Sequence, residues 1–334
     1  MKICIVGAGA IGGYLAVMLK KSGFQVSIVA RGPHLEAIKK NGLKLVTSVE
    51  EYTVQLDASE TVPDQAQDYA FVTVKATALE SLSTGLKKLS DNGATIIPAI
   101  NGLPHWYFFQ IGNKWENTYL KSLDPKRIFE KAVPFKSIIG TIVYPACEIV
   151  EPGIVKHISE TRFSLGEPSG EKTSRVLNLS KILTDSGLKA PVSKRIRDEI
   201  WIKLWGNVAF NPISALTGAT LEEICGNKET RSIAENIMKE SKKIGEAIGV
   251  KFPISIEKRI AGAAAVGNHK TSMLQDLEAG RNLEIDAIIS SVKELGELVK
   301  VDTPTIDCVL GLVKQRAYLV GSFEYSNLKD SLKN

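Results

Sequence analysis

Three polar side chains interrupt the apolar stretch from Trp201 to Pro212 at a spacing that could support chemistry. Lys203, Asn207 and Asn211 recur at every fourth position, so they share one face of a helix. Asparagine is a poor helix former, and a buried lysine is costly unless it is paired or its pKa falls. We interpret this stripe as a site for a polar ligand, with Lys203 as the best proton donor in the chain. The alternative is a solvent-facing stripe, although such faces usually carry better helix formers.

Other catalytic chemistries lack the residues they need. The four histidines do not cluster and the four cysteines form no Cys-x-x-Cys pair, so we expect neither a metal site nor a disulfide framework. The single Tyr-x-x-x-Lys runs from Tyr325 to Lys329 in the tail, where the acid of a short-chain dehydrogenase would not be found. The cysteine usage favours a reducing, cytoplasmic setting.

The elements that must position such a site begin with a glycine-rich turn. Residues 2–6 are typical of a buried parallel strand, and apolar residues at helical spacing follow until Gly23. The turn between them reads Gly7-Ala8-Gly9-Ala10-Ile11-Gly12. In this context Gly7 permits the turn, Gly9 lets a pyrophosphate approach the backbone, and Gly12 lets the helix pack on the strand. The pattern predicts a Rossmann-type dinucleotide site.

The residue after the second strand indicates which dinucleotide is bound. This strand, residues 25–30, ends at Arg31, where an NAD enzyme would normally place an acid on the ribose 2′-hydroxyl. A guanidinium attracts a 2′-phosphate. We therefore expect NADP(H), the alternative being a surface arginine.

Two further strand candidates, residues 69–75 and 94–101, flank a helical stretch over 79–89. This alternation predicts a parallel sheet. Lys75 and Asn101 stand at the carboxyl ends of these strands, where ligands bind in such sheets. Both side chains are therefore site candidates, against the alternatives of a surface lysine and a simple turn.

A second group of polar residues lies near the C-terminus. Ser272 with Gln275 matches a capping box that opens a short helix, and Glu284 opens a longer helix that runs to about Val299. A serine at a helix N-terminus can also bind a substrate carboxylate. A first-turn acid that complements the helix dipole is a sufficient explanation of Glu284.

Length and pattern together predict two domains in the 334 residues. Strands are expected over 138–144 and 161–165, with a turn at 151–153 between them, and the strand signals stop after a helix over 173–186. We expect an α/β domain with a doubly wound, mainly parallel sheet over residues 1–190. An all-helical domain that binds substrate and carries the catalytic residues should follow over residues 191–330.

Charge and hydropathy limit the classes of partner that the protein is expected to bind. The net charge of +5 is spread along the chain without basic runs, which argues against nucleic acid. No apolar run approaches the ~20 residues of a membrane-spanning helix, and no secretion signal opens the chain. A small-molecule substrate is the expected partner.

Taken together, these motifs resemble those of the ketopantoate reductases, 2-dehydropantoate 2-reductases that use NADPH. The resemblance spans nearly the whole chain and includes the runs Val74-Lys75-Ala76, Asn101-Gly102, Trp201-Ile202-Lys203-Leu204, Asn211-Pro212, Ser272-Met273-Leu274-Gln275-Asp276 and Glu284-Ile285-Asp286. It implies a Rossmann domain joined to a helical domain, with the active site in the cleft between them. The implied reaction makes pantoate for pantothenate and coenzyme A synthesis, and because dimers occur in the family a homodimer is an open alternative.

The resemblance also implies roles for single residues. Lys203 would be the general acid that protonates the alkoxide as hydride reaches the C2 carbonyl carbon. The substrate would be held by Asn101, Lys203, Asn207, Asn211 and Ser272, the last on its carboxylate. The cofactor would be held by the glycine-rich turn with Arg31, Lys75, Asn101, Ala146 and Glu284.

Departures from the family pattern concern the substrate. After Asn101-Gly102 the chain continues with Leu103-Pro104 into an aromatic segment, His105 to Phe109. These aromatic residues could form a lid, reshape the pocket or pack in the core. Residues 213–221 lack an asparagine that some members use for substrate. Two alternatives therefore stay open, a reductase of another bulky 2-oxo acid and an NADP(H)-binding sensor without turnover.

Overall fold

The computed structural model describes residues 1–323 of the chain, so the Tyr325 to Lys329 motif lies outside the described residues. The chain divides into two compact units. One comprises residues 1–119 with 124–196, and the other comprises residues 120–123 with 197–323. The roles expected for the two domains remain predictions.

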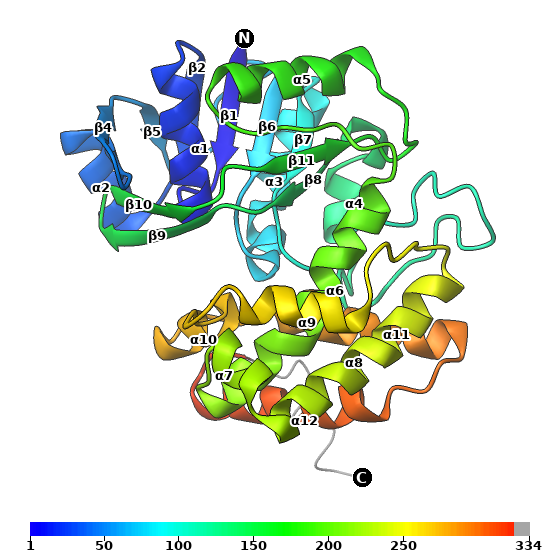
Figure 1. The fold of residues 1–334 in the computed structure, drawn as a ribbon. Coiled ribbons are helices and arrows are strands. Elements are labelled where there is room, and N and C mark those ends of the chain that lie inside the picture. Colours follow the sequence, from blue (N-terminus) through cyan, green and yellow to red (C-terminus); the bar gives the residue numbers. More distant parts are fainter. Residues whose placement is uncertain (324–334) are drawn as a thin grey trace, which may run out of the picture. The chain divides into compact units, whose positions relative to one another are not determined.

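The first unit is built on a parallel sheet with strand order β5-β2-β1-β6-β7 (Figure 1). Its strands are β1 (Lys2–Val6), β2 (Gln25–Val29), β5 (Asp57–Ser59), β6 (Tyr69–Val72) and β7 (Thr95–Pro98). Neighbouring strands are parallel throughout, and Val6 at the end of β1 lies opposite Val29 and Val72. The strand order reverses at β1, which is where doubly wound sheets bind ligands. The predicted Rossmann-type sheet is confirmed.

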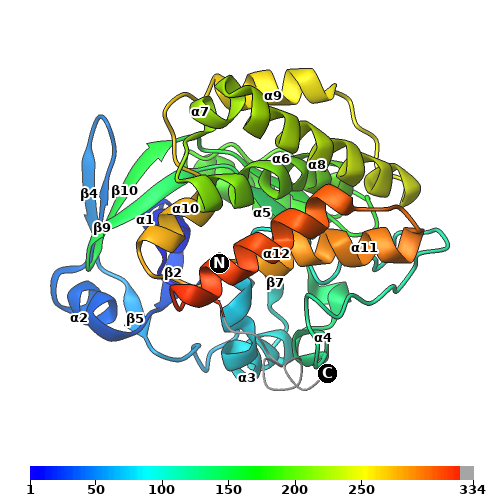
Figure 2. The same cartoon turned by 90° about the horizontal axis from the view of Figure 1, so that it is seen from below.

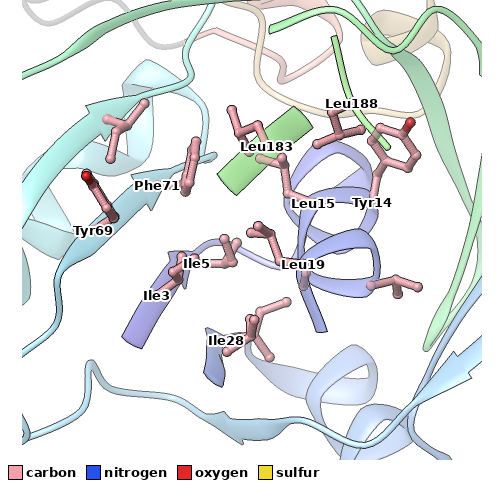
Figure 3. Packing of buried hydrophobic residues seen from close by; sticks show 14 of the residues in the cluster. Ile3, Ile5, Tyr14, Leu15, Leu19, Ile28, Tyr69, Phe71, Leu183 and Leu188 are labelled. Carbon is pink, nitrogen blue, oxygen red and sulfur yellow. The ribbon is translucent and has the colours of Figure 1, made fainter. Parts of the chain in front are cut away.

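The first unit also contains α-helices and short 3-10 helices. They are α1 (Ala10–Lys21), α2 (Gly32–Asn41), η1 (Ala76–Ala78), α3 (Leu79–Asp91), α4 (Ile128–Ala132), η2 (Phe135–Ser137) and α5 (Ser174–Asp185). The core joins β1, α1 and α5, where Ile5, Leu15 and Leu183 are fully buried (Figure 3). This packing holds the glycine-rich turn between two rigid elements.

A second sheet has the order β4-β3-β10-β9, with β3 (Leu43–Val46), β4 (Glu51–Val54), β9 (Ala146–Glu151) and β10 (Ile154–Ser159). Helix α1 contacts both sheets. The strands expected over 138–144 and 161–165 and the turn expected at 151–153 are all present. The sequence did not predict β9 and β10, the two strands that this turn joins. The two strands expected on either side of it, β8 (Gly140–Val143) and β11 (Phe163–Gly166), pair with each other. Most residues of β9 are exposed, so the strand lacks the apolar signal that marks a buried one.

The second unit is helical, with no strand among its described residues. Its helices are α6 (Ile196–Thr217), α7 (Leu221–Gly226), α8 (Lys228–Ala247), α9 (Ile256–Ala264), α10 (Ser272–Glu278), η3 (Asp286–Ser290), α11 (Ser291–Val299) and α12 (Pro304–Leu319). Helix α8 contacts α7, α9, α11 and α12 (Figure 2). Trp205 of α6 is fully buried and donates its indole N–H to the Met238 carbonyl at 2.8 Å, which fixes α6 on α8.

Candidate active site

The glycine-rich turn has the shape of a phosphate cradle. Gly7 has φ +110°, a conformation that suits glycine, and a Cβ on Gly12 would overlap the Gly7 carbonyl oxygen. A Cβ on Gly9 would meet nothing closer than the Thr73 carbonyl oxygen, at 3.8 Å. Gly9 is the N-cap of α1 and offers no side chain to the first-turn N–H groups, which therefore suit an anion. The turn fits a dinucleotide pyrophosphate.

Thr73 holds this turn in place, and sequence reasoning did not find it. Its hydroxyl donates to the Gly7 carbonyl at 2.6 Å, and its N–H donates to the Val6 carbonyl at 3.0 Å. Thr73 follows β6, which pairs with β1. The only signal available in the sequence was its place just after a buried strand.

The remaining residues of the expected cofactor site occupy separate positions in the first unit. Arg31 is exposed and is the N-cap of α2. Lys75 and Asn101 are half-buried and follow β6 and β7, so they lie at the carboxyl edge of the parallel sheet, as their pattern predicts. Ala146 opens β9 in the second sheet and is half-buried.

The polar stripe lies on one continuous helix, α6. Lys203 and Asn207 are half-buried, and Asn211 is only 5% exposed. Helix α6 continues through Pro212 to Thr217. The stripe is therefore not a fully exposed face, and its role as a polar site stays a prediction.

Burial changes the acidity of the lysine. Desolvation lowers the pKa of Lys203 to about 8, and the negative charge of Glu284 opposes this by raising it. Glu284 stands just before a helix that begins at Ile285 and continues as the π-helical turn η3 and then α11. The helix expected to run to Val299 is present, and its π-helical turn is a feature often found at functional sites.

The capping box expected at Ser272 is wrong. The N-cap of α10 is Thr271, whose hydroxyl accepts the Leu274 N–H at 3.3 Å, and Ser272 is the first helical residue. The Gln275 side chain instead donates to the Lys270 carbonyl at 3.1 Å. The hydroxyl of Thr271 therefore has the capping role that was expected of Ser272. The Thr271 residue is buried, whereas Ser272 is exposed.

The aromatic segment packs in the interior. Trp106, Tyr107 and Phe108 are at most 3% exposed. A Cβ on Gly140 would overlap the Trp106 ring, so the indole lies directly against the start of β8. Core packing therefore accounts for these three residues, whereas His105 and Phe109 at the two ends of the segment are half-buried.

Three structural features are absent among residues 1–323. The four cysteines, all within this range, are free. No cluster of three potential metal ligands occurs among these residues. None of their helices has the length and apolar character needed to cross a membrane.

A phosphate-binding turn on a parallel sheet, together with a helical unit that carries a half-buried lysine, defines the class of dinucleotide-dependent oxidoreductases. The model of the family "Ketopantoate reductase PanE/ApbA" matches residues 3–111, and that of its C-terminal part matches residues 195–317. The chain belongs to the ketopantoate reductase family, whose members are nicotinamide-dependent reductases.

Individual relatives agree with this membership. A 2-dehydropantoate 2-reductase from Mesorhizobium japonicum is 48% identical over 325 residues, which cover 97% of this chain and 100% of that protein. A structure from Ralstonia solanacearum described as a ketopantoate reductase is 38% identical with a TM-score of 0.92, covering 96% of this chain and 99% of that one. A 2-dehydropantoate 2-reductase from Geobacter metallireducens is 26% identical with a TM-score of 0.81, covering 94% and 99%.

Proposed function

We propose that this chain is a 2-dehydropantoate 2-reductase that uses NADPH to reduce ketopantoate to pantoate, with Lys203 as the general acid. Residues 1–190 hold the cofactor, and residues 191–330 hold the substrate and supply the acid. The observation that carries the proposal is the stripe on α6, where a lysine of lowered pKa stands one helical turn from Asn207.

The residues present suit this reaction. The bound nicotinamide supplies a hydride to the C2 carbonyl carbon, and charge then develops on the carbonyl oxygen. The Lys203 ammonium stabilises that charge and transfers its proton to the oxygen. A pKa of about 8 leaves the lysine mostly protonated at neutral pH while making it a stronger acid than an exposed lysine.

Polar groups around the acid would orient the substrate. Asn207 and Asn211 offer amide donors and acceptors to the hydroxyl and carbonyl groups of a 2-oxo acid. Ser272 is exposed at the first turn of α10 and would bind the carboxylate. Arg31 is exposed at the start of α2, after the strand that pairs with β1, and would bind the 2′-phosphate that distinguishes NADPH from NADH.

Steady-state kinetics test this function. The purified protein is assayed with NADPH and a panel of 2-oxo acids that includes ketopantoate, and the highest kcat/KM is expected with ketopantoate. A clear preference for another bulky 2-oxo acid would favour the second reductase hypothesis. Tight NADPH binding without oxidation by any member of the panel would favour the sensor.

A further inference from the structure

His34, which belongs to none of the sites above, connects two segments that are far apart in the sequence. It lies in the first turn of α2, three residues after Arg31. Its Nδ1 accepts the N–H of Gly153, in the turn between β9 and β10, at 2.9 Å. Gly153 has φ +81°, and a Cβ there would lie 3.1 Å from that of Ala37, so this turn packs closely on α2.

This hydrogen bond determines which ring nitrogen carries the proton. Because Nδ1 accepts, the neutral ring has its hydrogen on Nε2. Burial lowers the pKa of His34, which favours this neutral form, while the Ala8 backbone carbonyl acts in the opposite direction. The Nε2 atom is shielded from solvent and has no acceptor in good hydrogen-bonding geometry, although the Ala8 backbone lies close enough to raise the His34 pKa.

An unpaired buried donor beside the glycine-rich turn needs an explanation, since native proteins rarely retain one. Ala8 is the second residue of that turn and is 7% exposed, and Gly9 after it caps α1. A small movement of the turn toward α2 would bring the Ala8 carbonyl into line with Nε2–H. Binding of a pyrophosphate to the N–H groups beyond Gly9 acts on this same backbone.

We propose that His34 is a positioning residue for the dinucleotide, whose Nε2–H donates to the Ala8 carbonyl when the cofactor is bound. The bond joins the pyrophosphate turn to the helix that begins at Arg31, so both ends of the adenosine-diphosphate part are held by one rigid unit. The inference rests on the proposed function only in requiring a dinucleotide on this turn, and it does not depend on which oxo acid is reduced.

Two variants of similar size distinguish the observed hydrogen bond at Nδ1 from the proposed hydrogen bond at Nε2. His34→Asn keeps an acceptor close to the Nδ1 position and has no group that reaches Ala8. His34→Gln carries a donor close to the Nε2 position and lacks the short acceptor for Gly153. His34→Ala removes both, and Lys40→Ala at the exposed end of α2 serves as the control.

The measurement is the Kd for NADPH by fluorescence titration without oxo acid, together with the Tm of the cofactor-free protein. We expect His34→Asn to bind NADPH about tenfold more weakly than wild type, the loss of one hydrogen bond, with little change in Tm. His34→Gln should stay within about twofold of wild type in Kd although its Tm falls. In kinetics, the KM for NADPH should rise in His34→Asn while kcat and the KM for the oxo acid stay unchanged.

Wild-type affinity in His34→Asn would overturn the assignment, as would Kd losses that simply follow Tm across all three variants, since that result means a structural role alone. Failure of the proposed function would give a different result from failure of the His34 assignment. The wild-type protein would bind NADPH but reduce no 2-oxo acid, and the Kd values of the variants could still be compared.

Discussion

Lys203 of α6 and Glu284, just before η3, interact electrostatically, and the carboxylate of Glu284 raises the pKa that burial of Lys203 lowers. An acid must be protonated to donate, so activity should decrease as the pH rises through the lysine pKa. We expect kcat/KM for the oxo acid to fall above about pH 8. Glu284→Gln removes the contribution that raises the pKa, so this limb should move to lower pH. A pH–rate profile from pH 6 to 10 is measured for the wild type and for Glu284→Gln. A shift of the limb to higher pH in the variant would contradict the assignment of this limb to Lys203.

Removal of the proposed acid should separate chemistry from cofactor binding. Lys203→Ala should reduce kcat by about two orders of magnitude or more, because the two asparagines of the stripe are neutral and cannot act as general acids. The Kd for NADPH should change little, since Lys203 lies outside the first unit. Lys243→Ala, at an exposed position of α8, is the matched control. A Lys203→Ala enzyme with wild-type turnover would refute the role.

Cofactor preference should depend on Arg31. Arg31→Asp replaces an exposed cation at the start of α2 with an anion, which repels a 2′-phosphate and can accept a hydrogen bond from a ribose hydroxyl. The KM for NADPH should rise at least about tenfold while that for NADH rises less or falls. Lys40→Asp on the same helix controls for the charge change alone. Equal losses for both cofactors would argue against a 2′-phosphate contact.

A partly buried ion pair should contribute to the stability of the first unit. Arg175 of α5 donates to both carboxylate oxygens of Glu167, at 2.8 and 2.5 Å, and the Glu167 side chain is 3% exposed. Glu167→Gln leaves the partly exposed guanidinium without its counter-charge and should reduce the free energy of unfolding by about 2 kcal/mol. In the same helix, Lys181→Ala breaks an exposed pair with Asp185 and should cost less than about 0.5 kcal/mol. Urea denaturation compares the two variants, and similar losses would disprove the prediction.

Part of the candidate site could be predicted because its signals are local. The strand, glycine-rich turn and helix follow one another within the first 21 residues, and their periodicities and turn chemistry depend only on near neighbours. The same holds for Lys203, Asn207 and Asn211, since spacing alone places them on one helical face. Thr73 and His34 gave no comparable signal, because each acts through a hydrogen bond to backbone distant in the sequence.

Local patterns in the chain were sufficient to predict the class of the first domain, the helical character of the second unit and the set of polar residues on α6. The pairing of β10 with β3 and the burial of residues 106–108 could be seen only once the chain was folded. The same is true of the acidity of Lys203, which depends on burial and on Glu284. This division arises because hydrophobic period and turn chemistry are short-range properties of the chain. Desolvation, strand pairing and hydrogen bonds such as that between His34 and Gly153 depend on which distant segments become neighbours.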